Sequence, residues 1–391
     1  MATGEEIINF AILSLKNLNL FKYTIMKITF ILPHAGLAGG IRVVAIYAEM
    51  LQRRGHEVSV VSVPKAVPNW QSKLKSLVKG RGWPAHPLKK GSHFDGVDVP
   101  HRVLESFRPI VDDDVPDGDV VIATWWLTAE WVANLSKSKG AKAYFVQHHE
   151  LHNYLPIKRV KATYTLPLHK ITIAQWLVDL MASEYGDCNV DLVPNSVDLQ
   201  QFSAAPRSKQ ANPTVGIMYS TIDWKGCDLS LKAFDLAARQ IPNLQLVAFG
   251  KHQPTADLPL PAGAKFIYQP AQDTIKDIYA SCDAWLFGSR VEGFGLPILE
   301  AMACRTPVIG TPVGAAPELL AEGAGIIVPP EDPAAMAQAI AGIDKLSAAQ
   351  WRSMSDLAYS VATDYTWENA ADLFESALHH TINSRRKIAC V

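Results

Sequence analysis

The strongest constraint on the fold is a repeated alternation of short apolar runs with segments of helical periodicity. The apolar run at 27–32 ends in a glycine-containing loop, residues 44–51 then repeat apolar side chains at helical spacing, and another apolar run follows at 57–63. This order of strand, helix and strand predicts a βαβ unit, the building block of a parallel sheet. Further strands are predicted at 120–123, 143–147, 171–174 and 190–193.

A second series of the same kind begins after a polar, proline-bearing linker at 198–213. A helix is predicted at 229–239, and strands are predicted at 215–219, 244–250, 266–268, 284–287, 308–310 and 325–328. The sequence therefore predicts an α/β protein with two doubly wound parallel-sheet domains. The predicted parts are an N-terminal extension of unknown role (1–25), a first domain (26–205), a second domain (206–366) and a last helical segment (367–391).

The overall composition narrows the class of protein. The chain has 391 residues, 48% hydrophobic and 19% charged, and its net charge is -1, which indicates a soluble globular protein rather than a disordered or nucleic-acid-coating one. Its five cysteines show no CxxC or Cys/His spacing, so neither a disulfide framework nor a zinc site is predicted. Residues 1–25 lack the features of a signal peptide or a membrane-spanning helix. A cytoplasmic location is expected.

The segment 290–318 carries the clearest functional pattern. Gly293 and Gly295 permit unusual backbone torsions, and Pro297 suits the first turn of a helix, so a loop is expected to lead into a helix start. The N–H groups of a helix start form an anion site, and diphosphate is its usual biological occupant. Glu292 and Glu300 flank this loop. Because like charges repel, we expect both carboxylates to accept hydrogen bonds from sugar and ribose hydroxyls rather than to bind phosphate.

This Glu-x7-Glu arrangement, with Gly-Phe-Gly-Leu-Pro inside it, resembles the retaining family-4 glycosyltransferases. The resemblance covers about 26–380 and implies a GT-B fold, in which two Rossmann-like domains face a central cleft and the last helix crosses back to the first domain. It also implies that Glu292 faces the donor sugar and that Glu300 holds the ribose. The amides expected to face the sugar and diphosphate are those of Phe294, Gly295 and Leu296. The alternative is that Glu292 is an ordinary loop acid and Glu300 a solvated helix residue.

Another candidate cation lies in the first loop of the second domain. Lys225 can reach a diphosphate as a point charge, and Ser220 and Thr221 can donate from their hydroxyls. The resembled family usually has an arginine where this chain has Ser220, so Lys225 is expected to be the main cation that stabilises the leaving group. A solvated lysine at a helix start is the alternative.

Two loops of the first domain are further candidates. Gly39 and Gly40 follow the first strand and are predicted to let phosphate or an acceptor approach, or else to form a plain tight turn. Of the adjacent histidines after the strand at 143–147, His148 is the first choice for a donor-sugar contact and His149 the second. Structural histidines remain an alternative, and so does a metal site, although adjacent histidines give poor ligand geometry.

Two aromatic residues and one basic segment concern the acceptor. Trp125 and Trp126 are predicted either to stack against an acceptor sugar or to pack in the domain. Residues 65–90 combine an apolar helical face with many basic side chains, which favours weak association with an anionic membrane, or else a solvated helix over the core.

The resemblance implies a metal-independent, retaining transferase with Glu292, His148 and Lys225 in catalytic roles. It would move a hexosyl unit from a UDP- or GDP-sugar, used as co-substrate without a cofactor, to a glycan or lipid-linked oligosaccharide in polysaccharide biosynthesis. The expected partners are the nucleotide sugar and the glycan acceptor, with no nucleic acid, and the enzyme would be cytoplasmic or peripheral at the inner face of the cell membrane. Two alternatives stay open: a GT-B-type sugar-nucleotide epimerase and a non-catalytic nucleotide-sugar-binding subunit.

Overall fold

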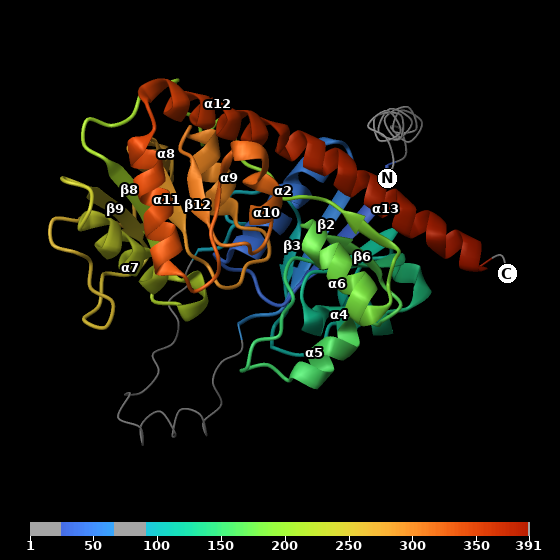
Figure 1. Cartoon of the computed structure of the whole chain (residues 1–391). Coiled ribbons are helices and arrows are strands. Elements are labelled where there is room, and N and C mark those ends of the chain that lie inside the picture. Colours follow the sequence, from blue (N-terminus) through green and yellow to red (C-terminus); the bar gives the residue numbers. More distant parts are fainter. Residues whose placement is uncertain (1–24, 66–90, 390–391) are drawn as a thin grey trace, which may run out of the picture. The chain divides into compact units, whose positions relative to one another are not determined.

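The computed structural model describes residues 25–65 and 91–389. The predicted basic segment at 65–90 and the N-terminal extension at 1–25 therefore lie outside the described residues, apart from one residue of each. The described chain divides into two compact units (Figure 1). One unit contains the residues up to Thr172, together with Met181–Asp191 and the chain from Ala371 onwards. The other contains Ile173–Leu180 and Leu192–Ala370.

The first unit is built on a seven-stranded sheet with the order β3-β2-β1-β4-β5-β6-β7, and the strands from β3 to β6 pair in parallel. Its strands are β1 (Lys27–Leu32), β2 (Glu57–Ser62), β3 (His101–Val103), β4 (Val120–Ala123), β5 (Ala141–Val146), β6 (His169–Thr172) and β7 (Val190–Leu192). The apolar runs at 27–32 and 120–123 form strands with the predicted bounds, whereas β5 and β6 each begin two residues earlier than predicted. The short and partly exposed β3 was not predicted.

Helices α2 (Gly39–Arg53), α4 (Trp126–Asn134), α5 (Ile157–Thr163), α6 (Gln175–Tyr185) and α13 (Trp367–Ala389) accompany this sheet, α6 and α13 each continuing from the other unit. The predicted face of α2 is buried, with Tyr47 and Leu51 fully enclosed. Gly55 follows α2 with φ of 93°, a left-handed conformation that favours glycine and ends the helix.

Aromatic packing attaches α13 to the first unit. The ring of Phe374 on α13 is fully buried, stacks on Tyr47 with ring centroids 4.3 Å apart and meets Phe145 edge-on at 5.2 Å. Burying a side chain of this size stabilises a fold by about 1.5–3 kcal/mol. The aromatic cluster therefore makes α13 part of the core of this unit.

The second unit has a six-stranded parallel sheet with the order β10-β9-β8-β11-β12-β13. Its strands are β8 (Thr214–Tyr219), β9 (Gln245–Gly250), β10 (Lys265–Tyr268), β11 (Ala284–Phe287), β12 (Val308–Gly310) and β13 (Gly325–Ile327). Its helices are α7 (Cys227–Ala238), α8 (Ile275–Ala280), α9 (Leu296–Ala303), α10 (Ala316–Leu319), α11 (Pro333–Lys345) and α12 (Ala348–Asp364). All six predicted strands of this series are present within one or two residues.

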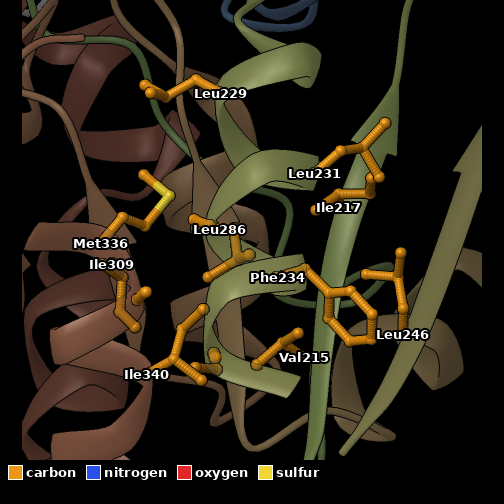
Figure 2. Packing of buried hydrophobic residues seen from close by; sticks show 14 of the residues in the cluster. Val215, Ile217, Leu229, Leu231, Phe234, Leu246, Leu286, Ile309, Met336 and Ile340 are labelled. Atoms are coloured by element: carbon orange, nitrogen blue, oxygen red, sulfur yellow. The ribbon is translucent and has the colours of Figure 1, made fainter. Parts of the chain in front are cut away.

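The core of the second unit lies between the sheet and the helices α7 and α11. Figure 2 shows Phe234 of α7 beside Leu246 of β9, and Ile340 of α11 on the other side of α7. Trp351 of α12 closes the same cluster and donates its indole N–H to the carbonyl oxygen of Asp283 at 2.9 Å. Because its one polar atom is paired, this large side chain can be fully buried at little cost.

Both sheets have the strand order of a Rossmann fold, with the first strand of each unit in the middle and the chain winding outward in both directions. The order reverses between β1 and β4 in the first sheet and between β8 and β11 in the second. Ligands of such sheets bind beyond the carboxyl ends of the strands at this switch point. The predicted fold class of two doubly wound parallel-sheet domains is confirmed. Within the described residues, no helix is both long and apolar enough to cross a membrane.

Candidate functional site

Two loops meet at the switch point of the second sheet. One follows β8 and contains Ser220, Thr221 and Lys225, and the other follows β11 and leads through Glu292 to α9. Gly226 has φ of 56°, and a Cβ added there would lie 1.7 Å from the carbonyl oxygen of Gly288. Only glycine therefore allows the two loops to approach so closely.

This approach pairs the candidate cation with a candidate carboxylate. Lys225 Nζ lies 2.7 Å from Glu292 Oε1, and Ser289 Oγ donates to the same oxygen at 2.8 Å. The side chain of Lys225 is 25% exposed and that of Glu292 is 11% exposed, so the pair is partly shielded from water and still accessible to a ligand. The sequence predicted both residues as site residues but not their contact.

The helix start of α9 has the geometry of an anion site. Gly295 has φ of 100° and precedes the helix, and Pro297 lies in its first turn. Within residues 25–65 and 91–389, no oxygen accepts a hydrogen bond from the backbone N–H of Phe294, Gly295 or Leu296. These donors are therefore available to an anion, and the helix dipole favours negative charge at this end.

The loop before α9 is held in place through its carbonyl oxygens. Trp176 donates its indole N–H to the carbonyl oxygen of Gly293 at 2.8 Å, and the N–H of Ala315 binds that of Phe294 at the same distance. Gly314 has φ of 61°, and a Cβ there would lie 2.4 Å from the Phe294 oxygen. Since the carbonyl groups are bound on the protein side, the adjacent N–H groups are fixed in direction.

Glu300 lies one turn into α9 and is oriented by a buried phenol. The hydroxyl of Tyr279 donates to Glu300 Oε2 at 2.9 Å, and Tyr279 is fully buried. The carboxylate of Glu300 itself is only half-buried. A carboxylate fixed in this way can accept hydrogen bonds from the two neighbouring hydroxyls of a ribose.

Arg290 stands near the loop but its guanidinium is already engaged. It donates to both carboxylate oxygens of Asp228 at 2.8 and 3.0 Å and forms an ion pair with Glu331. Arg290 therefore joins the two loops and does not supply a positive charge for a phosphate. Ser220 is half-buried, and its Oγ accepts the N–H of Ile222 at 3.2 Å, while Thr221 is exposed.

The first unit has its own set of loops at its switch point. Gly39 and Gly40 begin α2 and are exposed, and Gln147 donates to the carbonyl oxygen of Gly40 at 3.2 Å. The loop after β1 is thereby joined to the loop after β5. The predicted glycine loop thus contacts Gln147, which was not predicted as a site residue and directly precedes the predicted His148.

The two histidines after β5 differ in their surroundings. His148 Nδ1 lies 2.8 Å from the carbonyl oxygen of His149, and its ring stacks on that of His152. His149 Nε2 pairs with the hydroxyl of Tyr185 at 2.8 Å, and burial lowers the pKa of His149. His149 is thus neutral and packed against aromatic rings near pH 7.

Glu150 is buried next to these histidines. Its Oε2 accepts the backbone N–H of Trp126 at 2.9 Å, and its own N–H donates to the hydroxyl of Tyr164. Burial raises the pKa of Glu150 to about 8, opposed by the Trp126 hydrogen bond. Trp126 is itself buried and Trp125 half-buried, so Trp126 packs within the unit.

Sequence reasoning missed three residues that shape these loops: Trp176, Ser289 and Glu150. Ser289 lies within three residues of Glu292, so its proximity could have been noticed. Trp176 comes from α6, more than a hundred residues before the loop that it holds, and no local pattern signals that contact. Glu150 directly follows the predicted His149 in the sequence, but no local pattern signals its burial.

Residues 200–352 match the family model described as glycosyl transferases group 1. This chain carries a glycosyltransferase group 1 domain. The matched residues contain both loops of the second unit, including Lys225, Glu292 and Glu300.

Sequence comparison with characterised proteins also finds glycosyltransferases. The chain is 23% identical over 392 residues to the D-inositol 3-phosphate glycosyltransferase of Mycobacterium avium, covering 90% of this chain and 91% of that protein. It is 35% identical over 103 residues to the O-antigen chain mannosyltransferase B of Escherichia coli, covering 26% of each chain.

Solved structures share the fold. HepE of Anabaena in complex with UDP and glucose superposes with a TM-score of 0.69 at 16% identity, covering 90% of this chain and 99% of HepE. Sucrose-phosphate synthase of Thermosynechococcus elongatus superposes with a TM-score of 0.66 at 18% identity, covering 93% of this chain and all 100% of the other. The two Rossmann-like units of this chain therefore match the GT-B fold of solved glycosyltransferase structures.

Proposed function

We propose that this glycosyltransferase moves a hexosyl unit from a nucleotide-diphosphate sugar to a sugar hydroxyl of a glycan or lipid-linked oligosaccharide, with retention of anomeric configuration and without a metal ion. The observation that carries the proposal is the contact of Lys225 with Glu292 beside the available N–H groups at the start of α9. A cation, a carboxylate and directed N–H groups in one place suit a ligand that has both phosphates and hydroxyls.

In this proposal the diphosphate accepts hydrogen bonds from the N–H groups of Phe294, Gly295 and Leu296. It also forms an ion pair with Lys225. Glu292 accepts from a hydroxyl of the donor sugar, and Glu300, oriented by Tyr279, accepts from the ribose. Lys225 and the amides stabilise the negative charge that grows on the diphosphate as it leaves, which is the main way such a site lowers the barrier.

The reaction proposed is a front-face displacement. The bond between the anomeric carbon and the diphosphate oxygen breaks while the acceptor oxygen forms a bond to the same carbon on the same face. The proton of the acceptor hydroxyl passes to a phosphate oxygen of the leaving diphosphate. His148 is proposed as a contact of the donor sugar.

The ligands and activities of similar proteins support the proposed donor class. HepE has been solved with UDP-glucose, and the curated relatives are glycosyltransferases that act on D-inositol 3-phosphate or on O-antigen chains. A UDP- or GDP-hexose is therefore the proposed donor, and polysaccharide or glycolipid synthesis the proposed setting.

A panel of UDP-, GDP- and dTDP-sugars tests this proposal. The true donor should raise the melting temperature, because a ligand that binds only the native state stabilises it. Incubation of that donor with glycan acceptors should then yield a product of the same anomeric configuration, in the presence of EDTA. A protein that no nucleotide sugar stabilises would contradict the proposed site, and an inverted product would contradict the mechanism.

One observation favours a second candidate, a non-catalytic subunit that binds nucleotide sugars. Ser220 stands where the resembled family has an arginine, and Arg290 is engaged by Asp228 and Glu331. Such a subunit would be stabilised by the donor but would show neither transfer nor slow hydrolysis of the donor. Measuring released nucleoside diphosphate with and without acceptors separates the two functions.

A further inference from the structure

Three residues from separate segments of the first unit meet in a cluster that the proposed reaction does not use. His169 opens β6, Asp191 lies in β7 and His380 lies on α13. His169 Nε2 is 2.7 Å from Asp191 Oδ2, and His380 Nδ1 is 3.0 Å from the same oxygen. One nitrogen of each histidine and one carboxylate oxygen of Asp191 all lie within 4.8 Å of one another. Among the His, Cys, Asp and Glu side chains of the described residues, this group is close enough to hold a metal ion.

We propose that His169, Asp191 and His380 bind one divalent transition-metal ion of the zinc class, which fastens α13 to the edge of the first sheet. Two imidazole nitrogens and one carboxylate oxygen suit Zn²⁺, Co²⁺ or Ni²⁺, whereas Mg²⁺ and Ca²⁺ prefer sites made of oxygen alone. The inference is independent of the proposed transfer reaction.

The distances suit this ion after a small adjustment. With metal–ligand bonds of about 2.0–2.1 Å, ligand atoms in a tetrahedral zinc site lie roughly 3.3 Å apart. The observed nitrogen-to-oxygen distances of 2.7 Å for His169 and 3.0 Å for His380 are shorter than this by about 0.6 and 0.3 Å. The side chains of Asp191 and His380 are 30% and 43% exposed, so these two can shift away from the buried His169 without disturbing the core.

The exposure of the three side chains also suits a metal. The side chain of His169 is 6% exposed and that of Asp191 30% exposed, so the cluster has a rigid inner side and a side open to water, which would supply the remaining ligand. One oxygen of Asp191 lies within 3.0 Å of a ring nitrogen of each histidine, so the carboxylate is the contact that the two imidazoles share.

The basic residue next to His169 in the sequence, Lys170, points away from the cluster of His169, Asp191 and His380. Lys170 follows His169 in β6, so its side chain lies on the opposite face of the strand. Its ammonium group is bound to Asp187 at 2.8 Å and to the carbonyl oxygen of Leu166 at 2.9 Å. The positive charge of Lys170 is thus neutralised within its own contacts.

The consequence for the molecule concerns α13. This helix is already held by Phe374 in the aromatic cluster, and Glu375 pairs with Arg54 and His56. A metal at His380 would add a third attachment, about one and a half turns further along the helix than Glu375. It would stabilise the C-terminal part of α13 specifically.

The test uses the full-length protein without a histidine tag, stripped with EDTA and dialysed. Titration with CoCl₂ should give one bound ion per chain and the visible absorption bands of cobalt with nitrogen and oxygen ligands, which ZnCl₂ should then remove. At 100-fold excess over the dissociation constant, ZnCl₂ should raise the melting temperature of this unit by roughly 5–10 °C. Hydrogen exchange of residues 371–384 should slow in the same sample.

Substitutions separate the site from adventitious binding. His380→Asn and Asp191→Asn should each lower cobalt affinity at least tenfold and remove the absorption bands. His252→Gln, at an exposed histidine of the other unit, should change neither. Because His380 is largely at the surface, its variant should keep the melting temperature of the metal-free protein within a few degrees. The proposal would be overturned if the protein bound no cobalt, or if both substitutions left cobalt binding unchanged. Either result would show that the three residues form only a hydrogen-bonded cluster.

Discussion

The buried carboxylate of Glu150 makes a strong prediction about the pH dependence of stability. Burial raises the pKa of Glu150 from 4.5 to about 8, so the native state holds a proton that the unfolded state has lost between these two values. The contribution of this group to stability is therefore fully present below pH 4.5 and is lost as the pH rises through 8.

The size of the effect follows from the same pKa values. Each pH unit between the unfolded and folded pKa changes the free energy of unfolding by about 1.4 kcal/mol, so the rise from 4.5 to about 8 corresponds to on the order of 5 kcal/mol. In a unit of this size, 1 kcal/mol shifts the melting temperature by about 2–4 °C. A pH-dependent difference of roughly 10 °C or more is expected.

Calorimetric melting of the wild type and Glu150→Gln between pH 5 and pH 9 tests this reasoning. Glutamine keeps an oxygen that can accept the N–H of Trp126 but carries no ionisable proton. The variant should therefore gain stability relative to the wild type as the pH rises. Only in the wild type must the native state either bury a charged carboxylate or unfold around it. Glu184→Gln, at an exposed carboxylate, should show no such trend. If the difference between Glu150→Gln and wild type is the same at pH 5 and pH 9, the assigned pKa is wrong.

Three further predictions concern single residues. Glu300→Ala should weaken the affinity for the nucleotide-sugar donor about tenfold and change maximal turnover little. The reason is that the contact of Glu300 with the ribose is expected in both the ground state and the transition state. Steady-state kinetics with an unchanged KM for the donor would contradict this. Gly226→Ala should lower the melting temperature far more than Gly263→Ala. Both glycines have positive φ, but only at Gly226 would a Cβ overlap the backbone of another segment. Equal decreases in melting temperature would refute the argument from the close approach of the two loops. Glu375→Gln should cost stability at pH 7 and none near pH 2. The contacts with His56 and Arg54 lower the pKa of Glu375 to about 2, so its stabilisation is present above pH 4.5 and is lost as the pH falls. Parallel acid-unfolding curves of the variant and the wild type would contradict this.

Most of the fold could be predicted because each parallel strand is an apolar run bounded by polar loops. The run at 284–287 is fully buried and forms β11 at the predicted residues. In contrast, β3 has three residues that are mostly exposed, so it carries no apolar signal and depends on pairing with β2. Its existence is a tertiary effect that a local pattern cannot reveal.

The candidate site was predictable as a set of residues but not as a set of contacts. Lys225 and Glu292 stand 67 positions apart and meet because β8 and β11 are neighbours at the switch point. Arg290 could have been taken as a substitute for the family arginine, and only its bonds to Asp228 and Glu331 exclude that role. His169 and Asp191 meet because β6 and β7 are neighbours in the sheet, and His380 joins them through the docking of α13.

Calorimetric titration of a nucleoside diphosphate into Lys225→Met and Glu292→Gln tests the central claim most directly. The nucleoside diphosphate that corresponds to the donor identified by the nucleotide-sugar panel should bind Lys225→Met roughly 10–100-fold more weakly than wild type, the loss expected for one charge-assisted contact. It should bind Glu292→Gln as tightly as wild type or tighter, because that change removes a negative charge that competes for Lys225, while sugar transfer by Glu292→Gln falls by orders of magnitude. Wild-type affinity in Lys225→Met together with wild-type transfer in Glu292→Gln would contradict the account.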